Sequence, residues 1–462
     1  MPIFSELMRI VGLRRDRELQ APRPGSLVIA NLPPQRDLSL ALPDEDFPAV
    51  MIIGRAGTGK SVLVREMARL QGVNQVVLSP TGIAALNVGG QTIHSFFPNF
   101  PHHIIDPSNL EPVIGRRHIY QNLERLIIDE MSMVRADLLD AIDVSLRMHR
   151  GNGAPFGGVK VVMIGDFLQL PPVVRNEERP ILEDLGYRYP HLVASKALQN
   201  LRVRFVEMTK VFRQNDPQFI QLLGDIRLGR NLEGAVNAIN RACCGPHRKA
   251  VTPIVLTPRN VETDRLNRTK LAALPGPIFR YEGIVQGSFS LENDPLPVPL
   301  YLELKVGARI IMVRNDPGQR WVNGSLGTMT RTGPNCVWIC LDGKTEEYEI
   351  TRQKWEKIKY RWNQAENRII PEVVGSYSQL PLKLAWAVTI HKAQGLTLEN
   401  ARIDFGSGAF APGQAYVALS RVTSLEGLSL ARPFTVADVM VDPTSLAVTQ
   451  EISRRSIPWA DQ

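Results

Sequence analysis

Residues 54–61 carry a pattern that binds nucleotide phosphates. They read GRAGTGKS, which fits G-x-x-x-x-G-K-[ST]. Glycines let consecutive backbone N–H groups point at one phosphate cluster, and a following helix presents its positive N-terminus there. We expect Lys60 to neutralise the β- and γ-phosphates of ATP and the Ser61 hydroxyl to bind Mg²⁺. The remaining ATP-binding positions of this loop are Gly54, Ala56, Gly57, Thr58 and Gly59.

Two adjacent carboxylates, Asp129 and Glu130, follow the apolar run Leu126–Ile128. Such a pair at a strand end is, by itself, more often a solvated turn or a helix N-cap. Here the pair begins 69 residues after the phosphate-loop lysine, and this combination favours a catalytic role for the two carboxylates. Asp129 would then hold Mg²⁺ through water, and Glu130 would orient or deprotonate the attacking water. The two motifs together predict a hydrolase rather than a protein that only binds nucleotide.

Short, fully apolar runs precede these motifs and alternate with helical patterns. Strands of this kind indicate a parallel sheet that is covered on both faces. Open α/β sheets bind ligands just beyond the ends of their strands, so we predict a doubly wound α/β core with the phosphate loop at that edge. The runs are Val50–Ile53, Val76–Leu78, Leu126–Ile128 and Val161–Ile164, and the first helix carries Leu63, Met67 and Leu70 on one face.

The rest of the chain divides by composition. Residues 20–48 are rich in proline and polar residues, which predicts a loosely structured lead-in. A Pro/His-rich stretch over 98–121 is longer than an ordinary connection and indicates a small functional insertion. A second α/β region begins near Phe212, with a strand at Ile254–Leu256 and a helix after it. A β-rich block over 322–379, with a hairpin signal at Asp342-Gly343, interrupts this region.

Charge and composition narrow the class of protein. The 54 basic and 46 acidic residues give a net charge of +8, which weakly favours a polyanionic partner. We expect an intracellular protein without membrane contact, because no apolar run reaches the ~18 residues that span a bilayer and the N-terminus lacks targeting features. Four cysteines provide no disulfide framework. A metal half-site at Cys336 and Cys340 lacks a second Cys or His pair nearby, which favours core thiols.

Eight motifs between residues 54 and 424 resemble, in order, those of the petite-integration-frequency (PIF) helicases of superfamily 1B, relatives of the RecD and Dda helicases. The PFGG…GDFLQLPP segment and LAWAVTIHKAQG point to the PIF branch in particular. The motifs are GRAGTGKS (54–61), LSPTGIAALNVGGQTIHSFF (78–97), IIDEMSMV (127–134), PFGGVKVVMIGDFLQLPPV (155–173), VFRQND (211–216), VNGSLGTM (322–329), LPLKLAWAVTIHKAQGLTL (380–398) and GQAYVALSRVTS (413–424).

The resemblance implies two RecA-like P-loop domains with parallel sheets, a small wedge inserted in the first and an SH3-like β-barrel inserted in the second. The implied division is a lead-in over 1–48, domain 1A over 49–97 and 122–212, wedge 1B over 98–121, domain 2A over 213–321 and 380–462, and barrel 2B over 322–379.

The implied activity is that of an ATP-dependent 5′→3′ DNA helicase. It would translocate as a monomer on single-stranded DNA and unwind duplex, forked or other structured DNA in replication, repair or recombination. The expected compartment is the bacterial cytoplasm at the nucleoid, or the nucleus or mitochondrion of a eukaryote. Two alternatives stay open: a RecD- or Dda-branch helicase with a different partner, and a nucleotide-gated DNA-binding protein without unwinding activity.

Individual roles carry over by position. Gln169 resembles the residue that senses the γ-phosphate, and Arg213 and Arg421 resemble the two arginines that reach it from the second domain. Gly395 is expected to close a helix that begins after Pro381 and to add to the ATP site. Gln35 is the candidate for the glutamine that reads adenine. The implied DNA-binding residues are Thr81, His94, Thr257, Asn260, His391 and Lys392.

Alternation within residues 357–362 predicts a strand with one apolar and one basic face. Two interpretations remain open for it: a solvated strand of the small barrel, or a basic wall beside the DNA. The apolar positions are Ile358, Tyr360 and Trp362, and the basic ones are Lys357, Lys359 and Arg361.

Overall fold

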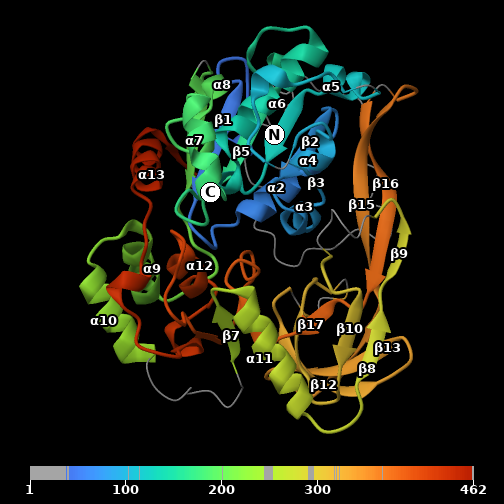
Figure 1. The fold of residues 1–462 in the computed structure, drawn as a ribbon, viewed down its shortest axis with the longest axis vertical. Helices are drawn as coiled ribbons and strands as arrows, with labels where there is room; N and C mark the ends of the chain where they lie inside the picture. The colour runs from blue at the N-terminus through green and yellow to red at the C-terminus, as the bar shows by residue number, and fades with distance from the viewer. Residues whose placement is uncertain are drawn as a thin grey trace, which may run out of the picture.

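A seven-stranded parallel sheet forms the first domain (Figure 1). The computed structural model describes residue 38 and residues 41–459, except 102, 114, 200, 244–252, 290–295, 317, 319, 322 and 367. The strand order is β21-β6-β1-β5-β4-β2-β3. The strands are β1 (Ala49–Gly54), β2 (Gln75–Ser79), β3 (Gln91–Thr92), β4 (Arg125–Ile128), β5 (Lys160–Gly165), β6 (Val203–Met208) and β21 (Ile457–Trp459).

Alternate side chains of these strands enter two separate hydrophobic cores. In β1, Val50 and Ile52 pack in the core that contains the buried face of α2, whereas Met51 and Ile53 pack in the core that contains α6. Successive strand side chains point to opposite faces, which confirms the predicted cover on both sides. The helices here are α2 (Lys60–Ala68), α3 (Gly82–Val88), α4 (Ile93–Phe96), α5 (Arg117–Asn122), α6 (Ala136–Arg150), α7 (Arg179–Asp184) and α8 (Lys196–Gln199).

A second parallel sheet, of order β18-β7-β19-β20, lies in the lower half of Figure 1. Two parallel sheets in one chain confirm the predicted two-domain α/β architecture. The strands are β7 (Ile254–Thr257), β18 (Ala387–Thr389), β19 (Ala401–Ile403) and β20 (Leu428–Leu430). The helices of this region are α9 (Pro217–Leu228), α10 (Leu232–Cys243), α11 (Asn260–Ala273) and α12 (Gln414–Leu419).

Antiparallel strands are inserted between β7 and β18. The Asp342-Gly343 turn joins β13 to β14, as its sequence predicts, and Gly343 has a φ of 71°. The insertion starts earlier than the expected residue 322, because β11 pairs with both β12 and β17. Its strands are β8 (Phe279–Glu282), β9 (Ile284–Gly287), β10 (Tyr301–Leu304), β11 (Arg309–Met312), β12 (Leu326–Thr332), β13 (Cys336–Leu341), β14 (Glu347–Thr351), β15 (Gln353–Asn363), β16 (Arg368–Gln379) and β17 (Leu382–Leu384).

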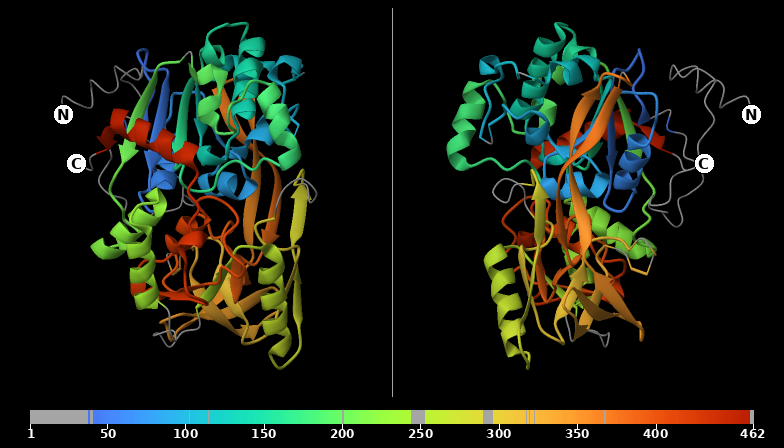
Figure 2. Two further views of the ribbon diagram at one scale, coloured as in Figure 1. Left: turned by 60° about the vertical axis from the view of Figure 1, so that its left-hand side comes forward. Right: turned by 90° about the vertical axis from the view of Figure 1, so that its right-hand side faces the viewer.

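The long β15–β16 hairpin runs from the insertion up beside the first domain (Figures 1 and 2). The Val77 backbone N–H donates to the Tyr360 hydroxyl at 3.1 Å, and the Tyr360 ring meets Phe96 edge-on. Ile358 and Trp362 pack against the same first-domain core. The predicted apolar face is confirmed, and it packs against the first domain. The two interpretations of the basic face, a solvated strand and a wall beside the DNA, stay predictions.

The C-terminal segment departs from the expected domain division. Strand β21 pairs in parallel with β6, and Trp459 is buried in the first domain's core. The preceding helix α13 (Pro443–Arg455) contributes Ile452 to that domain as well. Residues 443–459 thus belong to the first domain and not to domain 2A, because the open edge of β6 offers hydrogen bonds and apolar cover that local sequence does not reveal.

The helix expected between Pro381 and Gly395 is also wrong. The structure has two short strands there instead, β17 and β18. Strand β17 pairs with β11, and β18 pairs in parallel with β7. Hydrogen bonds from these distant strands outweigh the local helical preference of the segment.

Some of the sequence-based expectations fall at the margins of the described residues. Gln35 lies outside them, whereas Ala41 and Leu42 of the lead-in pack in the first domain's core. Among the described residues, no helix is both long and apolar enough to cross a membrane. Cys243 is buried as a core thiol, but Cys336 and Cys340 are partly exposed. In the same part of the chain, no cluster of three or more His, Cys, Asp or Glu side chains is arranged to hold a metal ion.

Candidate nucleotide and nucleic-acid sites

The phosphate loop connects the end of β1 to the start of α2. Gly57 and Gly59 have φ angles of 83° and 88°, in the left-handed region that favours glycine. A Cβ atom on Gly57 would also lie 2.6 Å from the Cβ of Arg213. The Phe212 backbone N–H donates to the Gly57 carbonyl at 2.9 Å. The loop is thus shaped by its own glycines and held by the segment that leads into the second domain.

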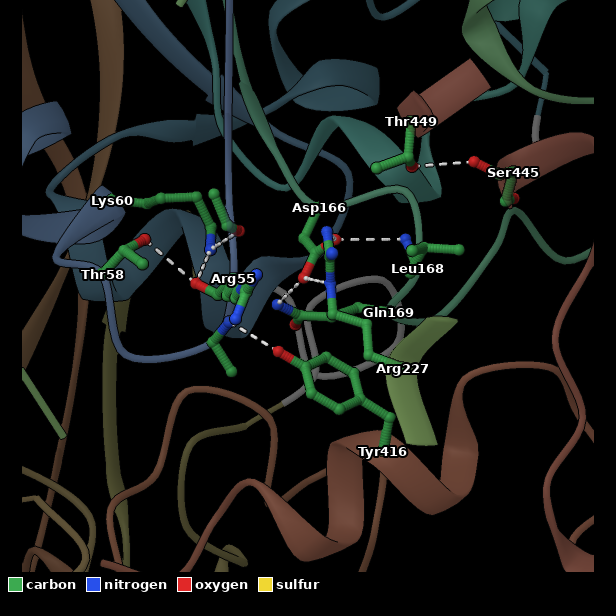
Figure 3. A network of polar contacts seen from close by, with 12 residues as sticks. Arg55, Thr58, Lys60, Asp166, Leu168, Gln169, Arg227, Tyr416, Ser445 and Thr449 are labelled. Atoms are coloured by element: carbon green, nitrogen blue, oxygen red, sulfur yellow. Dashed lines mark hydrogen bonds and ion pairs between the residues drawn. The ribbon is translucent and has the colours of Figure 1, made fainter. Parts of the chain in front are cut away.

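The polar groups of the loop are held by protein partners (Figure 3). Lys60 Nζ donates to the carbonyls of Gly54, at 2.7 Å, and Arg55, at 2.8 Å. Burial lowers the pKa of Lys60, while the charges of Asp166 and Glu130 oppose that change. The Ala56 backbone N–H donates to the Tyr416 hydroxyl, which belongs to the second domain, at 2.9 Å. The two carbonyl contacts use two of the three hydrogens of the Lys60 ammonium, which leaves one for a phosphate.

The two carboxylates lie where β4 ends, within electrostatic reach of Lys60. Burial, followed by the charge of Glu130, raises the pKa of Asp129 to about 7. Glu130 has φ 52° and ψ 45°, a left-handed conformation that costs a non-glycine residue about 1–3 kcal/mol and occurs mostly at functional sites. Burial also raises the pKa of Glu130. A raised pKa makes this carboxylate a stronger proton acceptor.

The residues expected to hold Mg²⁺ have suitable chemistry. Ser61 offers a hydroxyl in the first turn of α2, and Asp129 offers a carboxylate that is 4% exposed. Mg²⁺ prefers such oxygen ligands and usually takes only one or two from the protein. A divalent cation would also compensate for the burial of the Asp129 charge.

Gln169 occupies the middle of the site. It is 6% exposed, and its Nε2 donates to Asp166 Oδ2 at 3.3 Å. The Gln394 amide, from the second domain, donates to Gln169 Oε1 at 3.3 Å and to Glu130 Oε2 at 3.2 Å. The expected γ-phosphate sensor therefore connects groups of both domains.

A buried ion pair joins the two domains beside Gln169 (Figure 3). Asp166 follows β5, and Arg227 belongs to α9; Arg227 Nη2 lies 2.7 Å from Asp166 Oδ1. Burial favours the neutral carboxyl, but Arg227 outweighs it, so that the pKa of Asp166 is lowered. Breaking such a buried pair by removing one partner costs about 3–5 kcal/mol.

Both expected arginine sensors lie at this junction. Arg213 donates to Thr397 Oγ1 at 3.0 Å and to the Ser420 carbonyl at 3.1 Å. Arg421 is only 1% exposed, and its guanidinium donates to the Val417 carbonyl at 2.8 Å and Ser420 Oγ at 2.7 Å. Burial, followed by the charge of Arg213, lowers the pKa of Arg421 to about 9. Two close cations, neither with a carboxylate among these hydrogen-bond partners, suit an anionic ligand.

The expected DNA-binding residues of the first domain follow β2 and β3. Thr81 caps α3, where its side-chain oxygen accepts from the Ala84 N–H at 3.3 Å. His94, in α4, has its Nε2 3.2 Å from the Pro101 carbonyl. The two side chains therefore lie at the ends of neighbouring strands.

The expected DNA-binding residues of the second domain follow β7 and β18, which are paired. Asn260, His391 and Lys392 are exposed. Thr257 is 4% exposed, and its hydroxyl lies 2.6 Å from Thr263 Oγ1. Three of the four side chains are available to a ligand, whereas Thr257 stabilises the start of α11 from inside.

An exposed aromatic stack accompanies His391. The Phe410 ring lies 6.0 Å from the His391 ring at an interplanar angle of 18°, and the Arg259 guanidinium lies 5.6 Å from the centre of the Phe410 ring. Phe410 is 51% exposed. Stacked rings with a cation form the kind of platform on which nucleobases stack.

Sequence reasoning missed several residues of these sites. Asp166 ends an apolar run just as Asp129 does, so the same signal indicates it. Gln394 and Tyr416 lie inside motifs whose individual positions are not distinguished by local pattern. No local signal marks Phe410, because an aromatic residue in a Gly/Pro-rich loop has many explanations.

Comparisons with known proteins agree with this geometry. A family model described as PIF1-like helicase matches residues 44–235. The human ATP-dependent DNA helicase PIF1 is 35% identical over 413 residues, which cover 86% of this chain; the chain spans about three fifths of the length of this and similar animal relatives. A crystal structure of Pif1 from a Bacteroides species with ADP-AlF4 superposes with a TM-score of 0.81, at 33% identity, covering 89% of this chain and 94% of that one.

A bacterial relative matches over nearly the full length of both proteins. The ATP-dependent DNA helicase Pif1 of Bdellovibrio bacteriovorus is 31% identical over 445 residues, 92% of this chain and 94% of its own. Agreement over that span, together with the two parallel sheets and the phosphate loop at their junction, shows that this chain belongs to the PIF1-like helicase family.

Proposed function

We propose that this protein is an ATP-dependent DNA helicase that translocates 5′→3′ on single-stranded DNA and unwinds duplex or forked DNA. The observation that carries the proposal is the meeting of the phosphate loop, the acidic pair, the buried Arg421 and the half-buried Arg213 at the junction of two parallel-sheet domains. Binding and hydrolysis of a triphosphate at such a junction changes the contacts between the domains, which is what a translocating motor requires.

Each group has a role in hydrolysis. Lys60 and the loop amides bind the phosphates, and Ser61 and Asp129 would hold Mg²⁺, which supplies charge neutralisation at the β- and γ-phosphates. Glu130 accepts a proton from the attacking water, and Gln169 senses the γ-phosphate. Arg213 and Arg421 stabilise the charge that develops on the transferred phosphoryl group. Gly395 lies near this site and is proposed to contribute to the ATP pocket.

DNA would lie across the ends of the strands that carry the exposed polar residues. Thr81 and His94 of the first domain, with Asn260, His391 and Lys392 of the second, supply groups that contact phosphates. The Phe410 platform adds base stacking, which tolerates any sequence. A crystal structure of Bacteroides Pif1 bound to single-stranded DNA, and a structure that describes DNA unwinding at forked duplex DNA by two coordinating Pif1 helicases, support this assignment of partner.

Finer assignments rest on the same family likeness. Residues 98–121 are proposed as a wedge; Phe100, Ile105 and Tyr120 anchor the segment in the first domain's core, while Ser108 and Asn109 are exposed. The insertion is proposed as an SH3-like barrel. We propose a monomer as the basic active unit, although two coordinating Pif1 helicases unwind a fork in one related structure. We propose that the protein acts on DNA in replication, repair or recombination. The proposed compartment is the bacterial nucleoid, or the nucleus or mitochondrion of a eukaryote.

The decisive experiment compares duplexes that carry a 5′ or a 3′ single-stranded tail, with ATP and Mg²⁺. Unwinding of the 5′-tailed duplex alone is expected, with Lys60→Ala as the inactive control. Hydrolysis without unwinding of either duplex would favour a nucleotide-gated DNA-binding protein. Unwinding of the 3′-tailed duplex would reject the proposed polarity, and a requirement for a partner protein would favour a RecD- or Dda-like role.

A further inference from the structure

A tight turn carries the proposed DNA contacts of the second domain and also reaches the hydrolytic site. The turn follows β18 and spans residues 389–395. Three hydrogen bonds close it: the Ala393 N–H donates to the Thr389 carbonyl at 2.9 Å, the Gln394 N–H to the His391 carbonyl at 3.2 Å, and the Lys392 N–H to Thr389 Oγ1 at 3.3 Å. These bonds tie the DNA-facing residues of the turn to the residues that reach the hydrolytic site.

The two sides of this turn face different parts of the molecule. His391 and Lys392 are exposed, whereas the Gln394 side chain is half-buried and points toward the first domain. Gly395 ends the turn with a φ of 83°, and a Cβ atom there would meet no other atom within 4 Å. The glycine is therefore required by backbone conformation and not by packing.

Gln394 bridges the two groups that matter most for hydrolysis. Its Nε2 donates to Glu130 Oε2 at 3.2 Å and to Gln169 Oε1 at 3.3 Å. An amide nitrogen has two hydrogens, so the two bonds use its full donor capacity. The nitrogen thus lies between the proposed water-activating carboxylate and the proposed γ-phosphate sensor.

We propose that Gln394 is a positioning residue that restrains Glu130 and Gln169, and that single-stranded DNA, bound through His391 and Lys392, releases this restraint by drawing the 389–395 turn away from the first domain. ATP hydrolysis then becomes fast only when the protein is bound to single-stranded DNA. This inference rests on the proposed function, because it takes the roles of Glu130, Gln169 and the DNA-facing residues from it. It adds the residue through which DNA binding reaches the hydrolytic carboxylate.

The test is Gln394→Met, which keeps the length of the side chain but removes the amide donor. Without DNA, kcat for ATP hydrolysis should rise about fivefold, the factor that one net hydrogen bond of about 1 kcal/mol represents. At saturating oligo-dT, kcat should stay within about twofold of wild type, so that stimulation by DNA falls in proportion. The KM for ATP should not change, because the side-chain hydrogen bonds of Gln394 go to Glu130 and Gln169 and not to the phosphate loop.

A matched control is Gln450→Met on the exposed face of α13, which should leave every rate unchanged. Melting temperatures of both variants should match the wild type, which separates restraint from loss of structure. An unchanged or lower DNA-independent kcat in Gln394→Met, with stimulation intact, would overturn the inference alone. Absence of DNA stimulation in the wild-type protein, or hydrolysis by Glu130→Gln at the wild-type rate, would instead overturn the proposed function on which it rests.

Discussion

Replacing Arg421 by methionine should stabilise the folded protein while it destroys hydrolysis. Methionine retains most of the volume of the side chain but carries no charge. Arg421 is almost fully buried and its pKa is lowered to about 9, chiefly by burial. The difference from the ordinary value of 12.5 corresponds to a cost on the order of 5 kcal/mol, at 1.36 kcal/mol per pKa unit.

In the wild-type protein, hydrogen bonds of the Arg421 side chain offset part of this cost, and the methionine variant loses these bonds. The Arg421 guanidinium donates to the Val417 carbonyl and to Ser420 Oγ. These two acceptors keep each other as partners, because Ser420 Oγ also donates to the Val417 carbonyl at 3.1 Å. We therefore deduct about 1–1.5 kcal/mol for each of the two bonds lost, which leaves a net stabilisation of about 2–3 kcal/mol. That corresponds to a rise in melting temperature of roughly 4–12 °C for a domain of 150–250 residues.

Two assays on the same preparations separate the effects. Thermal denaturation without added nucleotide measures stability, and single-turnover ATP hydrolysis on oligo-dT measures catalysis. Hydrolysis should fall by on the order of 10³, the low end of what arginine fingers contribute. Arg421→Lys should restore little activity, because an ammonium lacks the planar fork. A methionine variant that melts below the wild type, or hydrolyses ATP within tenfold of it, would refute this reasoning.

Four further predictions follow from other contacts. Glu130→Gln should lower kcat by at least about 10² yet bind a fluorescent ATP analogue within threefold of wild type, and near-normal turnover would remove Glu130 from the catalytic role. Tyr360→Phe should reduce the free energy of unfolding in urea by about 1–2 kcal/mol, because a buried backbone N–H loses its partner; an unchanged denaturation midpoint would mean that the hairpin contact contributes nothing. Phe410→Ala should weaken oligo-dT binding by about 1–3 kcal/mol, whereas the equally exposed Tyr301→Ala in the insertion should not, and equal effects would reject the platform. Burial lowers the pKa of His191 in the folded protein, so the unfolded protein binds a proton at this histidine more readily. The free energy of unfolding should therefore fall as the pH drops below about 6.5. Urea titrations at about pH 5–8 should show a weaker pH dependence for His191→Gln.

Local sequence was sufficient to predict the loop, the strands and the acidic pair that form the first-domain part of the nucleotide site. The GRAGTGKS loop, the apolar runs of β1, β2, β4 and β5, and the Asp-Glu pair all follow from residues that are neighbours in the chain. Strand ends and helix starts are decided by such short-range patterns. The Asp342-Gly343 hairpin belongs to the same class, because a two-residue turn signal between strand-like runs needs no distant information.

Tertiary structure alone decided which groups meet. Ala56 and the Tyr416 hydroxyl are 360 positions apart, and Gln394 and Glu130 are 264 apart, so no local pattern connects them. The same reason explains the errors over β17 and β18, where pairing with distant strands overrides a helical preference. It also explains β21, which completes the first sheet after the chain has left it. Local sequence thus determines the chemistry that each residue can perform. Long-range packing determines which residues it contacts, because burial and strand pairing depend on surfaces that exist only once both domains have folded.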